Sequence, residues 1–139
     1  MSAISIYSTN KQIRQHVAGL LAKLAPEQVW PLRADYFSSF PEFLESGRSH
    51  PRRILFLAEE GPGSVELAAS IREVCPDHRF IWFSDLDFGL FSYRLETDYF
   101  GFLPVREEKL RRALQNCKNR DGPSARPSAK PAAAQDIPL

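Results

Sequence analysis

The amino-acid sequence predicts an α/β fold, a three-layer sandwich built around one parallel sheet. Short apolar runs alternate with amphipathic helical patterns along the chain, and the runs at 54–58 and 80–83 are apolar without a break. A run that does not alternate with polar residues is typical of a strand covered on both faces, as in a parallel sheet. The 139 residues are enough for one such domain.

A strand over 3–7 and an amphipathic helix open the predicted domain. Thr9 or Asn10 can cap this helix at its start. Its apolar residues recur at spacings of three and four, which indicates one buried face, and Pro26 ends the pattern. These apolar residues are Ile13, Val17, Leu20, Leu21 and Leu24.

A second strand is expected over 28–36, at the edge of the sheet or irregular because Pro31 lies inside it. A short helix over 37–46 follows. Its apolar face consists of Phe40, Phe43 and Leu44.

The strand and helix pattern then repeats three more times. We expect strands over 53–58, 80–83 and 99–103, and helices from a capping Ser64 to the residue before Pro76, over 86–95 and over 106–117. Right-handed crossovers join such units into a doubly wound sheet. Five strands fit the flavodoxin-like order 2-1-3-4-5, whose ligand chemistry lies at the carboxyl ends of the strands.

The composition changes sharply after Lys118. The segment 119–139 holds four prolines, five alanines and no aromatic residue. Such a segment buries too little apolar surface to offset its ordering entropy, so we expect a domain at 1–118 and a disordered tail at 119–139.

Charge and cysteine content narrow the functional class. The chain carries 18 basic and 17 acidic residues, whereas a dedicated nucleic-acid binder usually shows a basic excess. The two cysteines, Cys75 and Cys117, are too few for a disulfide framework and are expected to be free thiols on opposite faces of the sheet. Without a signal peptide or an apolar run long enough to span a membrane, the expected location is the cytoplasm.

Residues 54–114 resemble a bacterial response-regulator receiver domain, in particular the receivers that precede LytTR-type DNA-binding domains. The stretch Pro-Val-Arg-Glu-Glu-Lys-Leu at 104–110 is the most similar part, 28–50 match poorly, and the first strand and helix match loosely. The resemblance implies a flavodoxin-like, receiver-like fold and a place in two-component signal transduction and phosphorelay chemistry.

The resemblance also implies where the family's chemical residues would lie, and most of them are replaced. Ser8 and Thr9 occupy the positions of the acidic pair, Ala58 that of the phosphoacceptor aspartate and Leu103 that of the lysine. Magnesium needs carboxylate oxygens, and phosphoryl transfer needs charge neutralisation. We therefore expect a degenerate or pseudo-receiver locked in one state, with no catalytic residue, metal or cofactor. The retained family positions are Ser84, Phe100 (the aromatic switch position) and Pro104.

Four carboxylates are expected near the carboxyl ends of the strands. Glu59 follows Ala58, and a shift of one residue along a strand turns a side chain to the opposite face, which argues against Glu59 as a substitute acceptor. Together with Glu60, Asp85 and Asp87 it is expected to form a solvated acidic rim with helix-capping duties, the alternative being that the four carboxylates bind a cation. No pattern around the scattered His16, His50 and His78 predicts a zinc site.

Aromatic residues crowd the region from 83 to 102. Phe88, Phe91 and Tyr93 are spread around the fourth helix, so at least one should be exposed. The alternative is that the aromatic residues of this region form a well-packed core. Exposed aromatics beside cations are typical of a protein contact surface. In receivers, the fourth helix, fifth strand and last helix form the usual dimer or partner face. The predicted interaction face contains Phe88, Phe91, Tyr93, Arg94, Lys109 and Arg112.

The sequence thus favours a phosphorylation-independent protein-interaction module in bacterial signalling or transcriptional regulation, acting as a homodimer or through a protein partner. No enzymatic activity, membrane or direct nucleic-acid contact is expected. The alternative is a small-ligand binder, for phosphate or flavin, or an enzyme that uses the loop at 8–10.

Overall fold

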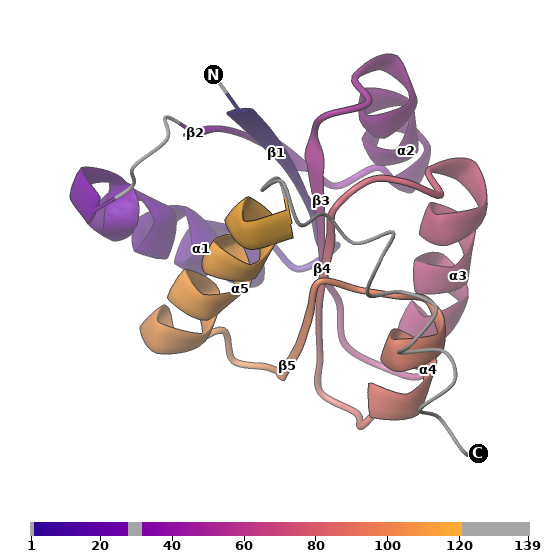
Figure 1. Ribbon diagram of the computed structural model, residues 1–139. Helices are drawn as coiled ribbons and strands as arrows, with labels where there is room; N and C mark the ends of the chain where they lie inside the picture. Colours follow the sequence, from indigo (N-terminus) through magenta and orange to yellow (C-terminus); the bar gives the residue numbers. More distant parts are fainter. Residues whose placement is uncertain (1, 28–31, 121–139) are drawn as a thin grey trace.

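The chain folds around a five-stranded sheet in which all strands are parallel. A computed structural model describes residues 2–27 and 32–120 (Figure 1). The strand order is β2-β1-β3-β4-β5, so the predicted fold class and sheet order are confirmed. The elements are β1 (Ser2–Tyr7), α1 (Lys11–Leu24), a short 3-10 helix (Ala25–Glu27), β2 (Leu32–Phe37), α2 (Phe40–Ser49), β3 (Ile54–Ala58), α3 (Ser64–Val74), β4 (Phe80–Ser84), α4 (Gly89–Arg94), β5 (Tyr99–Phe102) and α5 (Glu107–Arg120).

Helices cover the sheet on both faces. In Figure 1, α1 and α5 lie on one side of the strands and α2, α3 and α4 on the other. Two apolar clusters fill the spaces between these layers, and the side chains of β3 alternate between them: Ile54 and Phe56 join one, Leu55 and Leu57 the other. The central strands β3 and β4 are buried throughout, as their unbroken apolar runs predicted.

The cysteines follow the same division. Cys75 belongs to the cluster on the α3 face and Cys117 to the cluster on the α5 face, and both are free and buried. Burial raises the pKa of the Cys75 thiol, which disfavours the reactive thiolate. The expectation of free thiols on opposite faces is confirmed.

The first elements differ from the prediction mainly at their ends. Asn10 caps α1, because its side chain accepts hydrogen bonds from the backbone N–H groups of Gln12 (2.8 Å) and Ile13 (3.4 Å). The edge strand β2 pairs with β1, and its described residues are Leu32–Phe37. Residues 28–31 are outside the described part of the chain.

Three helices depart further from the sequence prediction. α2 begins at Phe40, three residues late, because Ser39 caps it. The expected Ser64 cap is wrong: Ser64 is already the first residue of α3, follows Gly63 and is buried. α4 has six residues instead of the ten expected at 86–95.

The last helix ends later than predicted. α5 continues to Arg120, so the helix passes the expected boundary at 118. The rest of the predicted tail, 121–139, is outside the described residues. Among the helices that the structure describes, none is long and apolar enough to cross a membrane.

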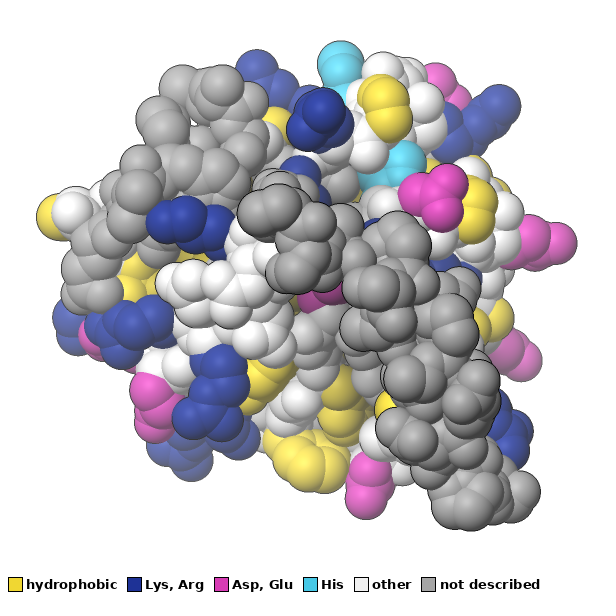
Figure 2. All heavy atoms as spheres, in the orientation of Figure 1, with side chains coloured by type: hydrophobic (Ala, Val, Ile, Leu, Met, Phe, Trp, Pro, Cys, Tyr) yellow, Lys and Arg dark blue, Asp and Glu magenta, His cyan; other side chains and the backbone are white. Residues whose placement is uncertain are grey.

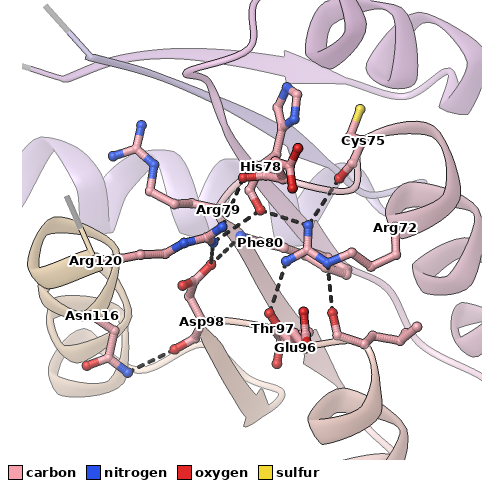
Figure 3. A network of polar contacts seen from close by, with 12 residues as sticks. Arg72, Cys75, His78, Arg79, Phe80, Glu96, Thr97, Asp98, Asn116 and Arg120 are labelled. Atoms are coloured by element: carbon pink, nitrogen blue, oxygen red, sulfur yellow. Dashed lines mark hydrogen bonds and ion pairs between the residues drawn. The ribbon is translucent and has the colours of Figure 1, made fainter. Parts of the chain in front are cut away.

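A polar network closes the amino ends of β4 and β5 (Figure 3). One oxygen of the Asp98 carboxylate accepts hydrogen bonds from the backbone N–H of Phe80 (2.8 Å) and from the guanidinium of Arg120 (2.8 Å). Beside it, Arg72 of α3 donates to the backbone carbonyls of His78 (2.7 Å) and Glu96 (3.0 Å). The network joins α3 and α5 to the end of the sheet opposite the strand carboxyl ends.

A second buried cation supports the edge of the sheet. Arg53 lies just before β3 and donates to the hydroxyl of Ser5 (3.1 Å) and to the carboxylate of Asp35 on β2 (2.7 Å). The Arg53 guanidinium holds the pKa of the Asp35 carboxyl below its usual value. No spacing in the sequence predicts this contact between Arg53 and the neighbouring strand β2.

Candidate functional site

The carboxyl ends of the parallel strands bring the predicted chemical positions to one edge of the sheet. Ala58 ends β3 beside Phe83, and Ser84 ends β4 beside Phe102 of β5. Leu103 follows directly, with its backbone N–H donating to the Ser84 carbonyl (3.0 Å). The Leu103–Pro104 peptide bond is cis.

At the acceptor position, Ala58 presents a methyl group that is fully buried. It belongs to the apolar cluster on the α1 and α5 face, and Leu103 packs against the same cluster. A methyl group has no lone pair to attack a phosphoryl donor, and the leucine brings no charge to neutralise one.

Glu59 forms the main polar contact at this edge. Its carboxylate accepts hydrogen bonds from the Ser8 hydroxyl (3.2 Å), the Thr9 backbone N–H (3.0 Å) and the Thr9 hydroxyl (2.7 Å). Burial raises the pKa of the Tyr7 hydroxyl, and the negative charge of the Glu59 carboxylate raises it further. Glu59 therefore binds the two positions where receivers have their acidic pair.

The direction of the Glu59 side chain does not follow from strand alternation. Because β3 ends at Ala58, Glu59 lies beyond the strand, and the rule that successive side chains point to opposite faces does not determine its direction. The hydroxyls of Ser8 and Thr9 were the sequence signal for this contact, because a carboxylate accepts hydrogen bonds from such donors.

The retained hydroxyl, Ser84, is buried and engaged locally. Its oxygen accepts a hydrogen bond from the backbone N–H of Leu86 (3.2 Å) and lies 3.4 Å from the Ser64 hydroxyl. Phe100, the other retained side chain, is half-buried and packs edge-on against Trp82, with ring centroids 5.3 Å apart.

Two of the other acids at this edge accept hydrogen bonds from backbone N–H groups of the loops. Asp85 accepts a hydrogen bond from the Gly61 N–H (2.8 Å), where a φ of 90° suits a glycine, and Asp87 accepts from the Gly89 N–H at the start of α4 (3.0 Å). No group of three potential metal ligands comes together within the described ranges 2–27 and 32–120.

A pocket of about 290 Å³ lies beside this edge, between α1 and the loops after β3, β4 and β5. Glu60 and Asp85 contribute carboxylates to it, and Leu103 and Ile13 contribute apolar walls. His16 also lines it and contacts the Val105 carbonyl through Nε2 (2.7 Å). Two carboxylates and an apolar wall make this pocket a poor match for an anion.

The predicted interaction face is only partly exposed. Phe91 and Tyr93 of α4 are exposed, with 47% and 39% of their surface accessible. Phe88 instead stacks on Trp82 (5.4 Å between ring centroids) and is half-buried. Of the predicted cations, Arg94 and Arg112 are exposed and Lys109 is half-buried.

Two exposed apolar side chains on the same elements were not foreseen. Leu90 of α4 is 49% and Phe102 of β5 is 44% exposed. Phe102 packs edge-on against Phe100, which links it to the aromatic core. Phe100 and Phe102 are two residues apart on β5, so alternation along the strand turns their side chains to the same face.

Replacing Glu59 with alanine should lower the free energy of unfolding by about 1 kcal/mol, because a half-buried carboxylate with three donors is lost. Urea denaturation followed by circular dichroism measures this. Glu60→Ala, which removes an exposed carboxylate one residue later, is the control and should change stability by less than about 0.5 kcal/mol. Equal effects of the two substitutions would contradict the role given to Glu59.

Comparison with known proteins gives the fold and no closer relationship. No family model matches the chain, and no curated protein matches it. Among solved structures, a response regulator receiver domain protein from Clostridium thermocellum matches with a TM-score of 0.70 at 18% identity, covering 86% of this chain and 96% of that one. FixJ-N matches with a TM-score of 0.69 at 14% identity, covering 86% and 94%. The BeF3-activated DrrB receiver domain matches with a TM-score of 0.61 at 21% identity, covering 86% and 99%. The chain therefore has the fold of the response-regulator receiver domains.

Proposed function

We propose that this chain is a pseudo-receiver, a receiver fold that acts as a protein-interaction module without aspartyl phosphorylation. The observation that carries the proposal is the fully buried methyl group of Ala58 where a receiver places its phosphoacceptor. The acidic-pair positions hold the hydroxyls of Ser8 and Thr9, and the lysine position holds Leu103. We place its action in bacterial signal transduction or transcriptional regulation, in the manner of receivers related to LytTR-type regulators.

The hydrogen bonds that Glu59 accepts support this proposal. A substitute acceptor needs a free carboxylate oxygen and a magnesium ion held by further oxygen ligands. Both oxygens of Glu59 already accept hydrogen bonds from Ser8 and Thr9. The carboxylate thus acts as an internal partner for the loop between β1 and α1, which favours a single state of this edge.

Beryllium fluoride, a mimic of the aspartyl phosphate, tests the proposal directly. We expect the two-dimensional amide NMR spectrum to stay unchanged when magnesium and beryllium fluoride are added, since no acceptor carboxylate is available. A receiver with an intact aspartate, titrated in the same buffer, provides the positive control.

Joint shifts of Ala58, Ser84 and Phe100 would overturn the proposal. Repeating that titration with Glu59→Gln would then show whether Glu59 had become the acceptor. Relaxation dispersion across β4 and β5 gives a second measurement, because widespread microsecond-to-millisecond exchange there would contradict a single locked state.

The alternative of a phosphate or flavin binder finds little support in the geometry. In the first turn of α1, the backbone N–H groups of Gln12 and Ile13 already donate to the Asn10 side chain. The neighbouring pocket carries the carboxylates of Glu60 and Asp85, which repel an anion. Binding of a phosphate or flavin is therefore the weaker proposal.

A further inference from the structure

The strand β2 forms a free edge of the sheet. Figure 1 places it beside β1, and the strand order β2-β1-β3-β4-β5 leaves its other side without a partner strand. An edge strand presents a row of backbone N–H and C=O groups that can pair with another chain. Lysine, proline or a bulge often protects such an edge. Residues 32–37 contain neither lysine nor proline, and they pair with β1 residue by residue without a bulge.

Alternate residues of β2 direct their backbone groups to the free side. The Ser8 N–H donates to the carbonyl of Phe37 (3.3 Å), so Phe37 directs its C=O toward β1. Successive residues of a strand in a parallel sheet direct their backbone groups to opposite sides, so Arg33 and Asp35 also face β1. The three residues whose backbone groups face away from the sheet are Leu32, Ala34 and Tyr36. Among the described residues, none outside the sheet forms a backbone hydrogen bond with them.

The side chains of β2 carry one charge of each sign. Arg33 and Asp35 lie on the same face of the strand, 3.3 Å apart, and their side chains are 58% and 39% exposed. Asp35 also binds the buried Arg53 (2.7 Å), and both contacts use the Oδ2 atom of the carboxylate. The Oδ1 atom can therefore accept a hydrogen bond from a cation outside this strand. Residues 32–37 hold no other charge.

Among the antiparallel registers that pair most of β2 with a second β2, one satisfies both the backbone and the charges. Hydrogen-bonded pairs must join outward-facing residues of both copies, which allows a centre at Arg33, Ala34 or Asp35. A centre at Arg33 or Asp35 places two like charges directly opposite each other, which is destabilising. A centre at Ala34 instead places Arg33 of each copy opposite Asp35 of the other. All three outward residues of each copy then exchange backbone hydrogen bonds, with Leu32 opposite Tyr36.

The charged surfaces of the helices lack this combination. Figure 2 shows Lys and Arg side chains over α5. A helix pairs its backbone groups internally except at its ends, so its side chains alone would have to hold a second copy. On α5, the acid Glu107 is already paired within the chain, with Lys23 (2.8 Å) and Arg111 (3.0 Å). The edge of β2 adds outward backbone groups to a pair of complementary charges.

We infer that two copies of this chain associate through β2, antiparallel and centred on Ala34, so that their two sheets become one. The two-fold axis makes the contact closed, and association stops at two copies. Cross-strand pairs of opposite charge and of apolar side chains stabilise it. Tyr36 is 39% exposed in the single chain and Leu32 is half-buried, so the second copy covers apolar surface. The inference goes beyond the proposed function, because it does not depend on the chemistry at Ala58.

The original chain provides the first test. Sedimentation equilibrium should show a monomer–dimer equilibrium with a dissociation constant of about 10–100 µM, as for a small contact. Amide hydrogen exchange should slow at alternate residues of β2 as the protein concentration rises. The N–H groups of Leu32, Ala34 and Tyr36 should gain protection, whereas those of Arg33 and Asp35 should not change, because they face β1. A chain that stays monomeric at about 500 µM would overturn the inference and leave the edge to a strand of another protein.

Substitutions in β2 test the register. Arg33→Asp places acids opposite each other and should weaken dimerisation about tenfold or more, whereas Arg33→Lys should keep it within about twofold. Ala34→Pro removes the central N–H donor, which faces away from the sheet, and should abolish the dimer with an unchanged circular dichroism spectrum. Arg112→Asp changes an exposed cation of α5 and is the control, which should leave the dimer intact. A dimer that Arg112→Asp disperses and the β2 substitutions do not would refute the site.

The exchange pattern keeps the inference testable if Ala34→Pro fails to fold. Dimerisation without added protection at the outward N–H groups of β2, or with equal added protection along the whole strand, would contradict the pairing. The beryllium fluoride titration is independent of these results. A phosphorylation response would overturn the proposed function and leave the β2 contact standing, whereas a monomeric chain would overturn the contact and leave the pseudo-receiver standing.

Discussion

Replacing Ala58 with aspartate is expected to lower the free energy of unfolding by about 3 kcal/mol without restoring phosphorylation. The position is fully buried in the cluster on the α1 and α5 face, so a carboxylate there loses its hydration. Leu103 provides no positive charge, and Ser8 and Thr9 provide no carboxylates to hold magnesium. The lone acid is then expected to become protonated, and burial alone raises its pKa.

Urea unfolding and phosphorylation by acetyl phosphate measure the two parts of this prediction. Ala58→Ser is the matched control, because it adds one hydroxyl at the same site and should cost about 1 kcal/mol. An Ala58→Asp variant that is as stable as the original chain and gains a phosphoryl group would show that the rest of the site is still competent. The account of a dismantled phosphorylation site would then be wrong.

The layered core was predictable because the apolar runs of the buried strands and the apolar spacings of the helices can be read from the sequence. Strands covered on both faces must be apolar at every position, and the runs of β3 and β4 meet that condition. The apolar spacings of α1 and α5 likewise identified their buried faces. Once five strands alternated with helices, the handedness of crossovers limited the possible orders of the sheet.

The ends of the helices were less predictable, because they depend on which of several nearby polar side chains caps the first backbone N–H groups. Ser39 and Asn10 cap helices in the structure, whereas Ser64 lies inside α3 with its hydroxyl near Ser84. Serine and asparagine are both good caps in isolation. What separates them is the tertiary environment, which is absent from a local pattern.

The polar contacts between distant elements follow from no spacing in the sequence. Glu59 reaches Ser8 and Thr9 across about fifty residues of sequence, and Arg120 reaches Asp98 across twenty-two. Neither pair follows a helical or strand spacing. The resemblance to receiver domains therefore located the candidate site in the sequence. The hydrogen bonds between Glu59 and the residues at the acidic-pair positions were found only in the structure.

Replacing Asp98 with alanine should lower the free energy of unfolding by about 3 kcal/mol, because removing one partner of a buried ion pair leaves the other charge unpaired. Asp98 and Arg120 have side chains that are only 9% and 12% exposed, with 2.8 Å between Oδ2 and Nη1. The substitution also removes the acceptor of the Phe80 N–H at the start of β4 (2.8 Å). The loss should open the end of the sheet that α5 closes.

Urea unfolding measures the change, and Glu45→Ala serves as the control. Glu45 also pairs with an arginine, Arg48, but both side chains are more than 60% exposed, so its loss should cost less than about 1 kcal/mol. Amide hydrogen exchange adds a local test: in Asp98→Ala, the Phe80 N–H should lose protection more than the N–H groups of β3, which lies further from α5. If both substitutions cost the same, burial does not set the value of the Asp98 pair, and α5 must be held to the sheet by its apolar face alone.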